Sequence, residues 1–269
     1  MALAVFLSTG TFTGRPNGRD PHLLSKYHEK LNCDGFELML YEEFYPKKAE
    51  IIHEYTSLGI NIPVVHFSKQ IGDLLSTQGD LAFSTALDKT LEDCDIALSL
   101  GATRGVFHPW GIPDSDTHID MICDRIAELF EKTKNTGIEL LPENCVCTHS
   151  SPHKNLEKLL KLVPCKITVD TRAAHFHGEV YETLDAFLPD TVGHFHLIDY
   201  IGAPLDWEAR RNICQPAEST FISFEHLLDK IKSSGFNGTL TLESSHMLTD
   251  GVACDIFNNS IDFIRSIVS

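Results

Sequence analysis

Strand-like and helix-like segments alternate eight times along this chain of 269 residues. The strand-like segments are short apolar runs, at residues 2–8, 35–40, 61–67, 104–108, 137–143, 166–170, 192–197 and 238–243. Each precedes a stretch that we expect to be helical, near residues 20–31, 46–58, 83–100, 117–136, 153–162, 179–188, 221–234 and 254–267. Eight such units in about 250 residues match the size and rhythm of a closed barrel. The sequence therefore predicts an α/β protein with a single (β/α)₈ TIM-barrel domain over residues 1–269.

The expected helix ends support this interpretation. Gly59, Gly101, Gly137 and Gly235 stand just past four of the helical stretches, where a left-handed residue commonly ends a helix. The rival architecture, a doubly wound open sheet, usually carries a glycine-rich phosphate-binding turn after its first strand. Residues 8–18 contain glycines but no G-x-G-x-x-G pattern, so the barrel is favoured.

Charge and composition narrow the class of protein. The chain has 22 basic and 38 acidic residues and a net charge of −16, which repels a polyphosphate backbone and disfavours nucleic acid as a partner. No apolar run reaches the ~18 residues of a membrane span, and the N-terminus lacks the pattern of a secretory signal. The eight cysteines include no C-x-x-C pair, as is typical of reduced thiols. We expect a soluble, cytoplasmic protein that does not act at a membrane.

Acidic and imidazole side chains stand at or near the ends of seven of the eight expected strands. They are Glu37, His66, His108, Glu143, Asp170, His196 and Glu243. In a barrel these strand ends converge on one cavity. Three carboxylates around one point repel each other unless a cation is present, and oxygen-rich sets with one or two imidazoles suit Mn²⁺, Mg²⁺, Zn²⁺ or Co²⁺. The sequence therefore predicts a divalent-metal centre.

Five short motifs are spread over most of the chain. They are VFHPW (106–110), LPEN (141–144), VDT with a later glycine (169–171 and Gly178), GHFHLID (193–199) and GTLTLE (238–243). In order and strand assignment the chain resembles the xylose isomerase-like barrel superfamily, especially its sugar phosphate isomerase/epimerase and endonuclease IV-like branch. The resemblance implies that Glu143, Asp170, His196 and Glu243 bind one divalent metal ion. It also implies that Glu143 and Glu243 are catalytic and move a proton of the substrate.

The leading hypothesis is a divalent-metal-dependent isomerase or epimerase of a small sugar, sugar phosphate or polyol-derived ketone. A metal bound to a carbonyl and its neighbouring hydroxyl lowers the pKa of the C–H between them and stabilises an enediolate, while a carboxylate transfers the proton. Return of the proton to the opposite face gives epimerisation, and return to the adjacent carbon gives aldose–ketose isomerisation. The sequence leaves this choice open, along with the sugar, the metal and whether the chain forms a homo-oligomer.

Three other functions are weighed against this one. An endonuclease IV-like phosphodiester hydrolase at abasic DNA sites would use His66 and His108 as ligands, but Ala173 stands three residues after Asp170, where the DNA-repair members carry histidine. Residues 204–212 also contain no Asp-x-His pattern. A dehydratase or lyase acting on a hydroxy-keto substrate would need few additional groups, because a β-hydroxyl can be lost from the same enediolate. A binding protein without activity is disfavoured by the two intact glutamates.

Further residues are expected close to the substrate. The candidates for binding it are His66, His108, His175, Glu37 and Trp110, and Lys69 is expected near the same rim. A second metal is the alternative partner for His66 and His108. Arg172 and Arg210 or Arg211 are candidates for contacting a phosphate or carboxylate, with an ordinary surface position as the alternative. We expect only one of His194 and His196 to face the barrel interior, and the family motif selects His196.

Overall fold

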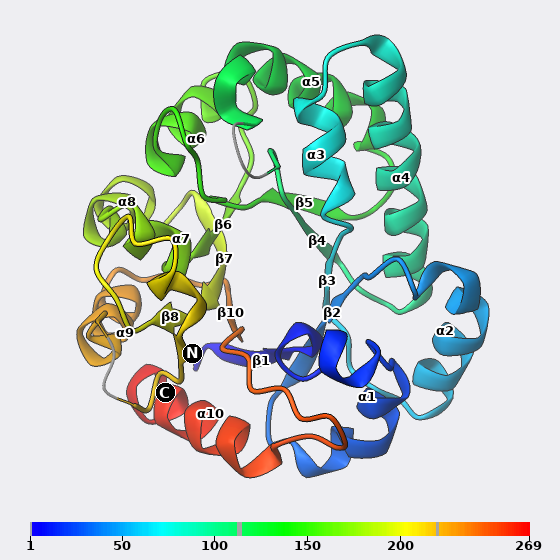
Figure 1. Ribbon diagram of the computed structural model, residues 1–269, viewed down its shortest axis with the longest axis vertical. Helices are drawn as coiled ribbons and strands as arrows, with labels where there is room; N and C mark the ends of the chain where they lie inside the picture. Colours follow the sequence, from blue (N-terminus) through cyan, green and yellow to red (C-terminus); the bar gives the residue numbers. More distant parts are fainter. Residues whose placement is uncertain (1, 112–114, 219–220) are drawn as a thin grey trace.

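Eight parallel strands form a nearly closed barrel at the centre of the protein, and helices surround it (Figure 1). The structure is a computed structural model that describes residues 2–111, 115–218 and 221–269. The barrel strands are β1 (Ala4–Ser8), β2 (Gly35–Met39), β3 (Val64–His66), β4 (Arg104–Phe107), β5 (Glu139–Pro142), β6 (Ile167–Asp170), β7 (Val192–Leu197) and β10 (Thr239–Leu242). They follow one another in chain order, with β10 between β7 and β1. The predicted (β/α)₈ barrel is confirmed.

Ten α-helices lie in the described part of the chain, most of them on the outside of the barrel. They are α1 (His22–Tyr27), α2 (Lys48–Ser57), α3 (Gln70–Ser76), α4 (Asp80–Ser99), α5 (Ile119–Thr133), α6 (Pro152–Leu160), α7 (Thr171–Phe176), α8 (Val180–Phe187), α9 (Phe224–Ser233) and α10 (Cys254–Val268). Eight of them correspond to predicted stretches, whereas the short helices α3 and α7 were not expected. The four glycines predicted to end helices all have positive φ, between 66° and 85°. None of these helices is both long and apolar enough to cross a bilayer.

Side chains inside the barrel form an apolar layer with a polar layer beyond it. Phe6, Val64, Val106 and Leu141 pack together in the barrel interior. Side chains two residues apart on a strand point the same way, so the next inward positions are Ser8, His66, His108 and Glu143. The chain thus places polar groups at the carboxyl ends of the strands, above an apolar plug.

The barrel closes between β5 and β6 through an asparagine. A single bridge joins Glu143 to Thr168, and the Asn144 side chain completes the connection. Its Nδ2 donates to the carbonyl oxygen of Asp170 at 3.0 Å, and its Oδ1 accepts from the Asp170 N–H at 2.5 Å. This clamp fixes Glu143 and Asp170 relative to each other, although they come from different strands.

The connection between β7 and α9 contains a small antiparallel hairpin that the sequence analysis treated as a long loop. Its strands are β8 (Asp199–Tyr200) and β9 (Ile213–Cys214), and a 3₁₀ helix, η6 (Ala209–Arg211), lies between them. Figure 1 shows β8 close to α7. The hairpin brings side chains from this long connection to the carboxyl end of the barrel.

Candidate active site

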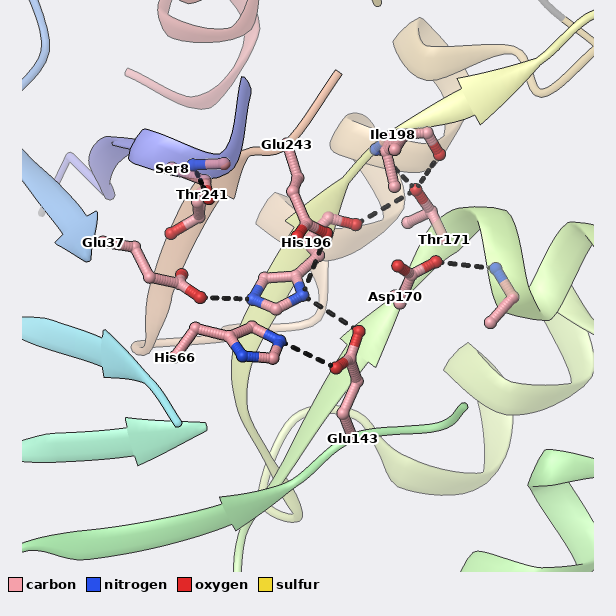
Figure 2. A network of polar contacts seen from close by, with 12 residues as sticks. Ser8, Glu37, His66, Glu143, Asp170, Thr171, His196, Ile198, Thr241 and Glu243 are labelled. Atoms are coloured by element: carbon pink, nitrogen blue, oxygen red, sulfur yellow. Dashed lines mark hydrogen bonds and ion pairs between the residues drawn. The ribbon is translucent and has the colours of Figure 1, made fainter. Parts of the chain in front are cut away.

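Four of the predicted residues meet at the carboxyl ends of the strands. Glu143 follows β5, Asp170 ends β6, His196 lies in β7 and Glu243 follows β10. One ligand atom from each lies within 4.8 Å of the others, and Figure 2 shows the four side chains directed toward a common point. The barrel therefore gathers three carboxylates and one imidazole, here called the quartet, from four successive strands.

The electrostatics of the quartet favour a bound cation. Burial and the negative charges of the two neighbouring glutamates raise the pKa of Asp170 to about 7, and the positive charge of Arg172 only partly opposes this rise. Burial by itself lowers the pKa of His196, but the surrounding glutamates outweigh it and raise that pKa well above the ordinary value. Carboxylate oxygens with one imidazole nitrogen are ligands that suit Mn²⁺, Zn²⁺, Co²⁺ and Mg²⁺. The donor set fits one divalent metal ion.

Glu37 determines which nitrogen of His196 faces the quartet. Its Oε1 lies 2.9 Å from His196 Nε2 and its Oε2 lies 2.9 Å from His194 Nε2. Burial raises the pKa of Glu37, but the charges and hydrogen bonds of both histidines outweigh burial and hold it well below its usual range. The ionised carboxylate only accepts hydrogen bonds, so each Nε2 carries a proton. Nδ1 of His196 is therefore directed toward Glu143 Oε1 at 3.1 Å and Glu243 Oε2 at 3.3 Å.

This position differs from the substrate-binding role predicted for Glu37. Glu37 lies in the middle of β2 rather than at its end, and it is fully buried beneath His196. It does not line the cavity described below. The structure thus gives Glu37 a contact with a quartet member and a place outside the cavity, and its substrate-binding role stays a prediction.

His194 and His196 both face the barrel interior, so the prediction that only one would do so was wrong. Side chains two residues apart on a strand share a face, and it is Phe195, between them, that packs in the outer core. His194 is fully buried, with Nδ1 2.7 Å from Thr239 Oγ1. The alternation His-Phe-His in the sequence could have predicted that both histidines share the inward face.

His66 and His108 both contact Glu143. Their Nε2 atoms lie 3.3 Å and 3.0 Å from Glu143 Oε2, and the three residues form a second group whose ligand atoms lie within 4.8 Å of one another. Burial lowers the pKa of His108 to about 4 despite the charge of Glu143. His108 is therefore neutral near pH 7 and donates its Nε2 proton to Glu143.

A cavity of about 280 Å³ adjoins the quartet. Besides Glu143, Asp170 and Glu243, it is lined by Lys69, His108, Cys145, Val146, Arg172, Ala173, Arg210, Arg211 and Ile213. The sequence analysis missed Cys145, Val146, Ala173 and Ile213 as lining residues. The first three follow Glu143 or Asp170 by two or three positions, and this short spacing could have identified them. Ile213 lies in the hairpin of β8 and β9, which was not predicted.

Trp110 and His175, both predicted to bind the substrate, do not line this cavity. Trp110 is fully buried and its Nε1 donates to the carbonyl oxygen of Cys145 at 3.0 Å. His175 Nδ1 lies 2.5 Å from Asp199 Oδ1, and its ring stacks on Tyr200 at a centroid distance of 4.4 Å. These contacts hold the loops that follow β5 and β7.

The fold and the site together define a TIM-barrel protein with a candidate metal site. Its carboxylate and imidazole side chains and its cavity lie at the carboxyl ends of the strands, where proteins of this fold have their active sites. The family model described as xylose isomerase-like TIM barrel matches residues 26–267. The chain belongs to this family. No curated protein matches the sequence.

Solved structures agree with the fold. A D-tagatose 3-epimerase-like protein has 17% sequence identity and a TM-score of 0.74, covering 99% of this chain and 100% of that chain. The IolI protein with a bound zinc atom has 12% identity and a TM-score of 0.70, covering 98% and 96%. A xylose isomerase-like TIM barrel/4-hydroxyphenylpyruvate dioxygenase fusion protein has 17% identity and a TM-score of 0.72; the match covers 99% of this chain and 42% of the fusion. At these identities the likeness shows the fold alone.

Proposed function

We propose that this protein is a divalent-metal-dependent isomerase or epimerase of a small sugar or sugar-derived ketone. The quartet carries the proposal, because it combines a metal-type donor set with two glutamates that approach from different sides. In the barrel β6 and β7 separate β5 from β10. Figure 2 shows Glu143 and Glu243 on opposite sides of His196. A carbon atom held between them has a carboxylate on each side.

Glu143, Asp170, His196 and Glu243 would hold the metal ion. When bound, a divalent cation polarises a carbonyl and lowers the pKa of the adjacent C–H. The protein's own task is then to remove that proton and to return it, and a positioned carboxylate does both. Removal from one face and return from the other inverts the carbon, whereas return to the neighbouring carbon converts ketose to aldose.

The contacts of the two glutamates favour different roles. Both oxygens of Glu143 are already engaged, Oε1 with His196 and Oε2 with His66 and His108. Burial raises the pKa of Glu143, but the positive charge of His196 and the hydrogen bonds from His108 and His196 outweigh burial and hold it well below its usual range. Glu243 has one such contact, to His196, and its side chain is 13% exposed. We therefore assign the first proton abstraction to Glu243 and the opposing position to Glu143.

The size and lining of the cavity support a small-molecule substrate over DNA. A cavity of about 280 Å³ lies just below the roughly 300–1,000 Å³ of typical small-molecule sites, which suits one monosaccharide. Ala173 lines the cavity where a three-metal site would need a histidine. Two of the similar structures are described as a 3-epimerase-like protein and as a zinc-containing protein, in line with the proposed chemistry and metal.

Solvent exchange tests this proposal. Protein stripped of metal and reloaded with Mn²⁺, Co²⁺, Mg²⁺ or Zn²⁺ is incubated with ketoses in D₂O. We expect deuterium to enter the carbon beside the carbonyl, as followed by proton NMR, and Glu243→Gln to slow this exchange roughly 10²–10⁴-fold. Glu139→Gln is the matched control, because Glu139 begins β5 at the opposite end of the barrel and pairs with Arg104. Exchange at the wild-type rate in Glu243→Gln, or no metal binding, would contradict the proposal.

A further inference from the structure

Four cationic side chains line the same cavity as the quartet. Lys69 precedes α3, Arg172 lies in α7, and Arg210 and Arg211 lie in η6. They come from the connections after β3, β6 and β7, so the fold brings them together from three distant segments. The chain as a whole carries 38 acidic and only 22 basic residues. We call these four side chains the basic wall, and such a group in an acidic protein calls for a specific explanation.

Three of these four side chains form no direct ion pair with a carboxylate of the described residues. Within the described ranges, no carboxylate oxygen lies within 4.0 Å of a side-chain nitrogen of Lys69, Arg172 or Arg210. Arg211 pairs with Glu208 at 3.5 Å, and both side chains are largely exposed. The three other cations keep N–H groups available for an anion that is not part of the described chain.

Aromatic rings hold Arg210 in place. Its guanidinium carbon lies 4.6 Å from the ring centre of Trp207 and 5.9 Å from that of Phe176, and the two rings meet edge to face at 4.8 Å. Stacking on aromatic faces positions a guanidinium while leaving its N–H edge free for bidentate contact with phosphate or carboxylate. Arg210 is therefore oriented without a counter-ion.

The wall has one other role to consider, which is to balance the negative charge of the quartet. Arg172 acts in this way, because its charge lowers the pKa of Asp170 against the effect of burial. Arg210 is placed differently. Burial lowers the pKa of Arg210, and the like charges of Arg172 and Arg211 lower it further. Arg210 thus belongs to a crowded group of cations, which an anion from outside would relieve.

We propose that Lys69, Arg172, Arg210 and Arg211 bind an anionic group of the substrate, a phosphate or a carboxylate, so that the substrate is an anionic ketose rather than a neutral sugar. This inference rests on the proposed function. The carbonyl end of the substrate lies at the quartet and its anionic end at the basic wall. Each charged hydrogen bond of this kind typically contributes about 10–100-fold in affinity.

Paired substrates test the proposal with the metal-loaded protein. Deuterium exchange is compared for D-xylulose and D-xylulose 5-phosphate, and for D-fructose and D-fructuronate. We expect kcat/KM for one anionic sugar to exceed that for its neutral partner at least tenfold, with the difference mainly in KM. Preference for the phosphate or for the uronate identifies the anionic group. If neutral sugars exchange equally well, the anionic substrate is ruled out while the proposed function stands.

A binding measurement decides the point when none of these sugars reacts. Inorganic phosphate and acetate are titrated into the protein by calorimetry. We expect at least one to bind, and Arg210→Ala to weaken it about tenfold or more. Arg210→Gln serves as a second variant if Arg210→Ala fails to fold. Arg15→Ala is the control, because Arg15 is exposed and lies outside the cavity. No anion binding, or equal loss in the control, overturns the inference whether or not the protein is an isomerase.

Discussion

Buried carboxylates occur in two regions of the molecule and are treated differently in each. Asp93 in α4, outside the barrel, accepts hydrogen bonds from Tyr45 Oη at 2.7 Å and from the Ser68 N–H at 2.9 Å. The carboxylates of the quartet lie within 4.8 Å of one another, and histidines contact two of them, Glu143 and Glu243. The hydrogen bonds of Asp93 thus come from neutral donors, whereas three carboxylates as close together as those of the quartet need positive charge.

Asp116 follows the structural rule as well. It accepts from the backbone N–H of Thr148 at 3.0 Å and of Ser150 at 2.8 Å, and it ties down the segment after β5. Backbone and side-chain hydrogen bonds lower its pKa against the effect of burial. The difference between the two regions is therefore one of partners rather than of burial. Substitutions in the quartet should change catalysis and metal binding, whereas substitution of Asp93 should change the pH dependence of stability.

The largest effect is expected at the glutamates of the quartet. Glu243→Gln and Glu143→Gln should each lower turnover roughly 10²–10⁴-fold, as expected for loss of a general base, in the exchange assay described above. The free energy of unfolding of the metal-free Glu243→Gln protein should not fall, because this change removes one of three repelling charges and leaves Glu143 paired with His196. A strongly destabilised metal-free variant would mean that the quartet is structural, like Asp93.

The next effect concerns the pH dependence of stability at Asp93. Burial raises its pKa to about 6 despite the hydrogen bonds from Ser68 and Tyr45. A raised folded-state pKa contributes stability that is present below the unfolded value near 4 and is lost as pH rises through 6. Asp93→Asn should therefore gain roughly 2.5 kcal/mol relative to wild type between pH 4 and pH 7. Urea unfolding at several pH values measures this gain.

Asp95→Asn provides the matched control for this prediction, because Asp95 lies on the same helix but is exposed. Its unfolding free energy should track wild type across the same pH range. Parallel pH profiles for Asp93→Asn and wild type would show that Asp93 is ionised in the folded state without penalty.

A smaller effect is expected at Glu37, which touches the quartet only through His196. Glu37→Gln leaves one acceptor oxygen in place of two. The Nε2 donors of His194 and His196 each need an acceptor, so one of them loses its hydrogen bond. Loss of such an orienting partner typically costs about 10–100-fold in metal affinity, which calorimetry or chelator competition measures. Glu139→Gln should bind metal as wild type does. Unchanged affinity in Glu37→Gln would show that barrel packing alone orients His196.

The convergence of the quartet was predictable because it depends on strand ends alone. Glu143, Asp170, His196 and Glu243 each stand at or near the end of an apolar run, and parallel strands in a barrel place those ends at one rim. Glu37 was misplaced because its position in the middle of a strand was mistaken for the end. The error over His194 came from assigning opposite faces to residues two apart.

Other features depend on contacts that no local pattern encodes. Trp110 and His175 are polar-tipped aromatic residues near the rim, and only the tertiary partners, Cys145 and Asp199, show that they are engaged elsewhere. The basic wall combines three connections of unrelated sequence. Its assembly required the hairpin of β8 and β9, whose two-residue strands are too short to carry a periodic signal.

Metal stoichiometry tests the central claim most directly. Metal-free protein is titrated with Mn²⁺, Zn²⁺, Co²⁺ or Mg²⁺ by calorimetry, and bound metal is counted after dialysis. We predict one ion per chain for at least one of these metals and a large loss of affinity in Asp170→Asn, with Asp93→Asn binding as wild type does. The absence of binding, three ions per chain, or affinity unaffected by Asp170→Asn would contradict a single metal ion held by the quartet.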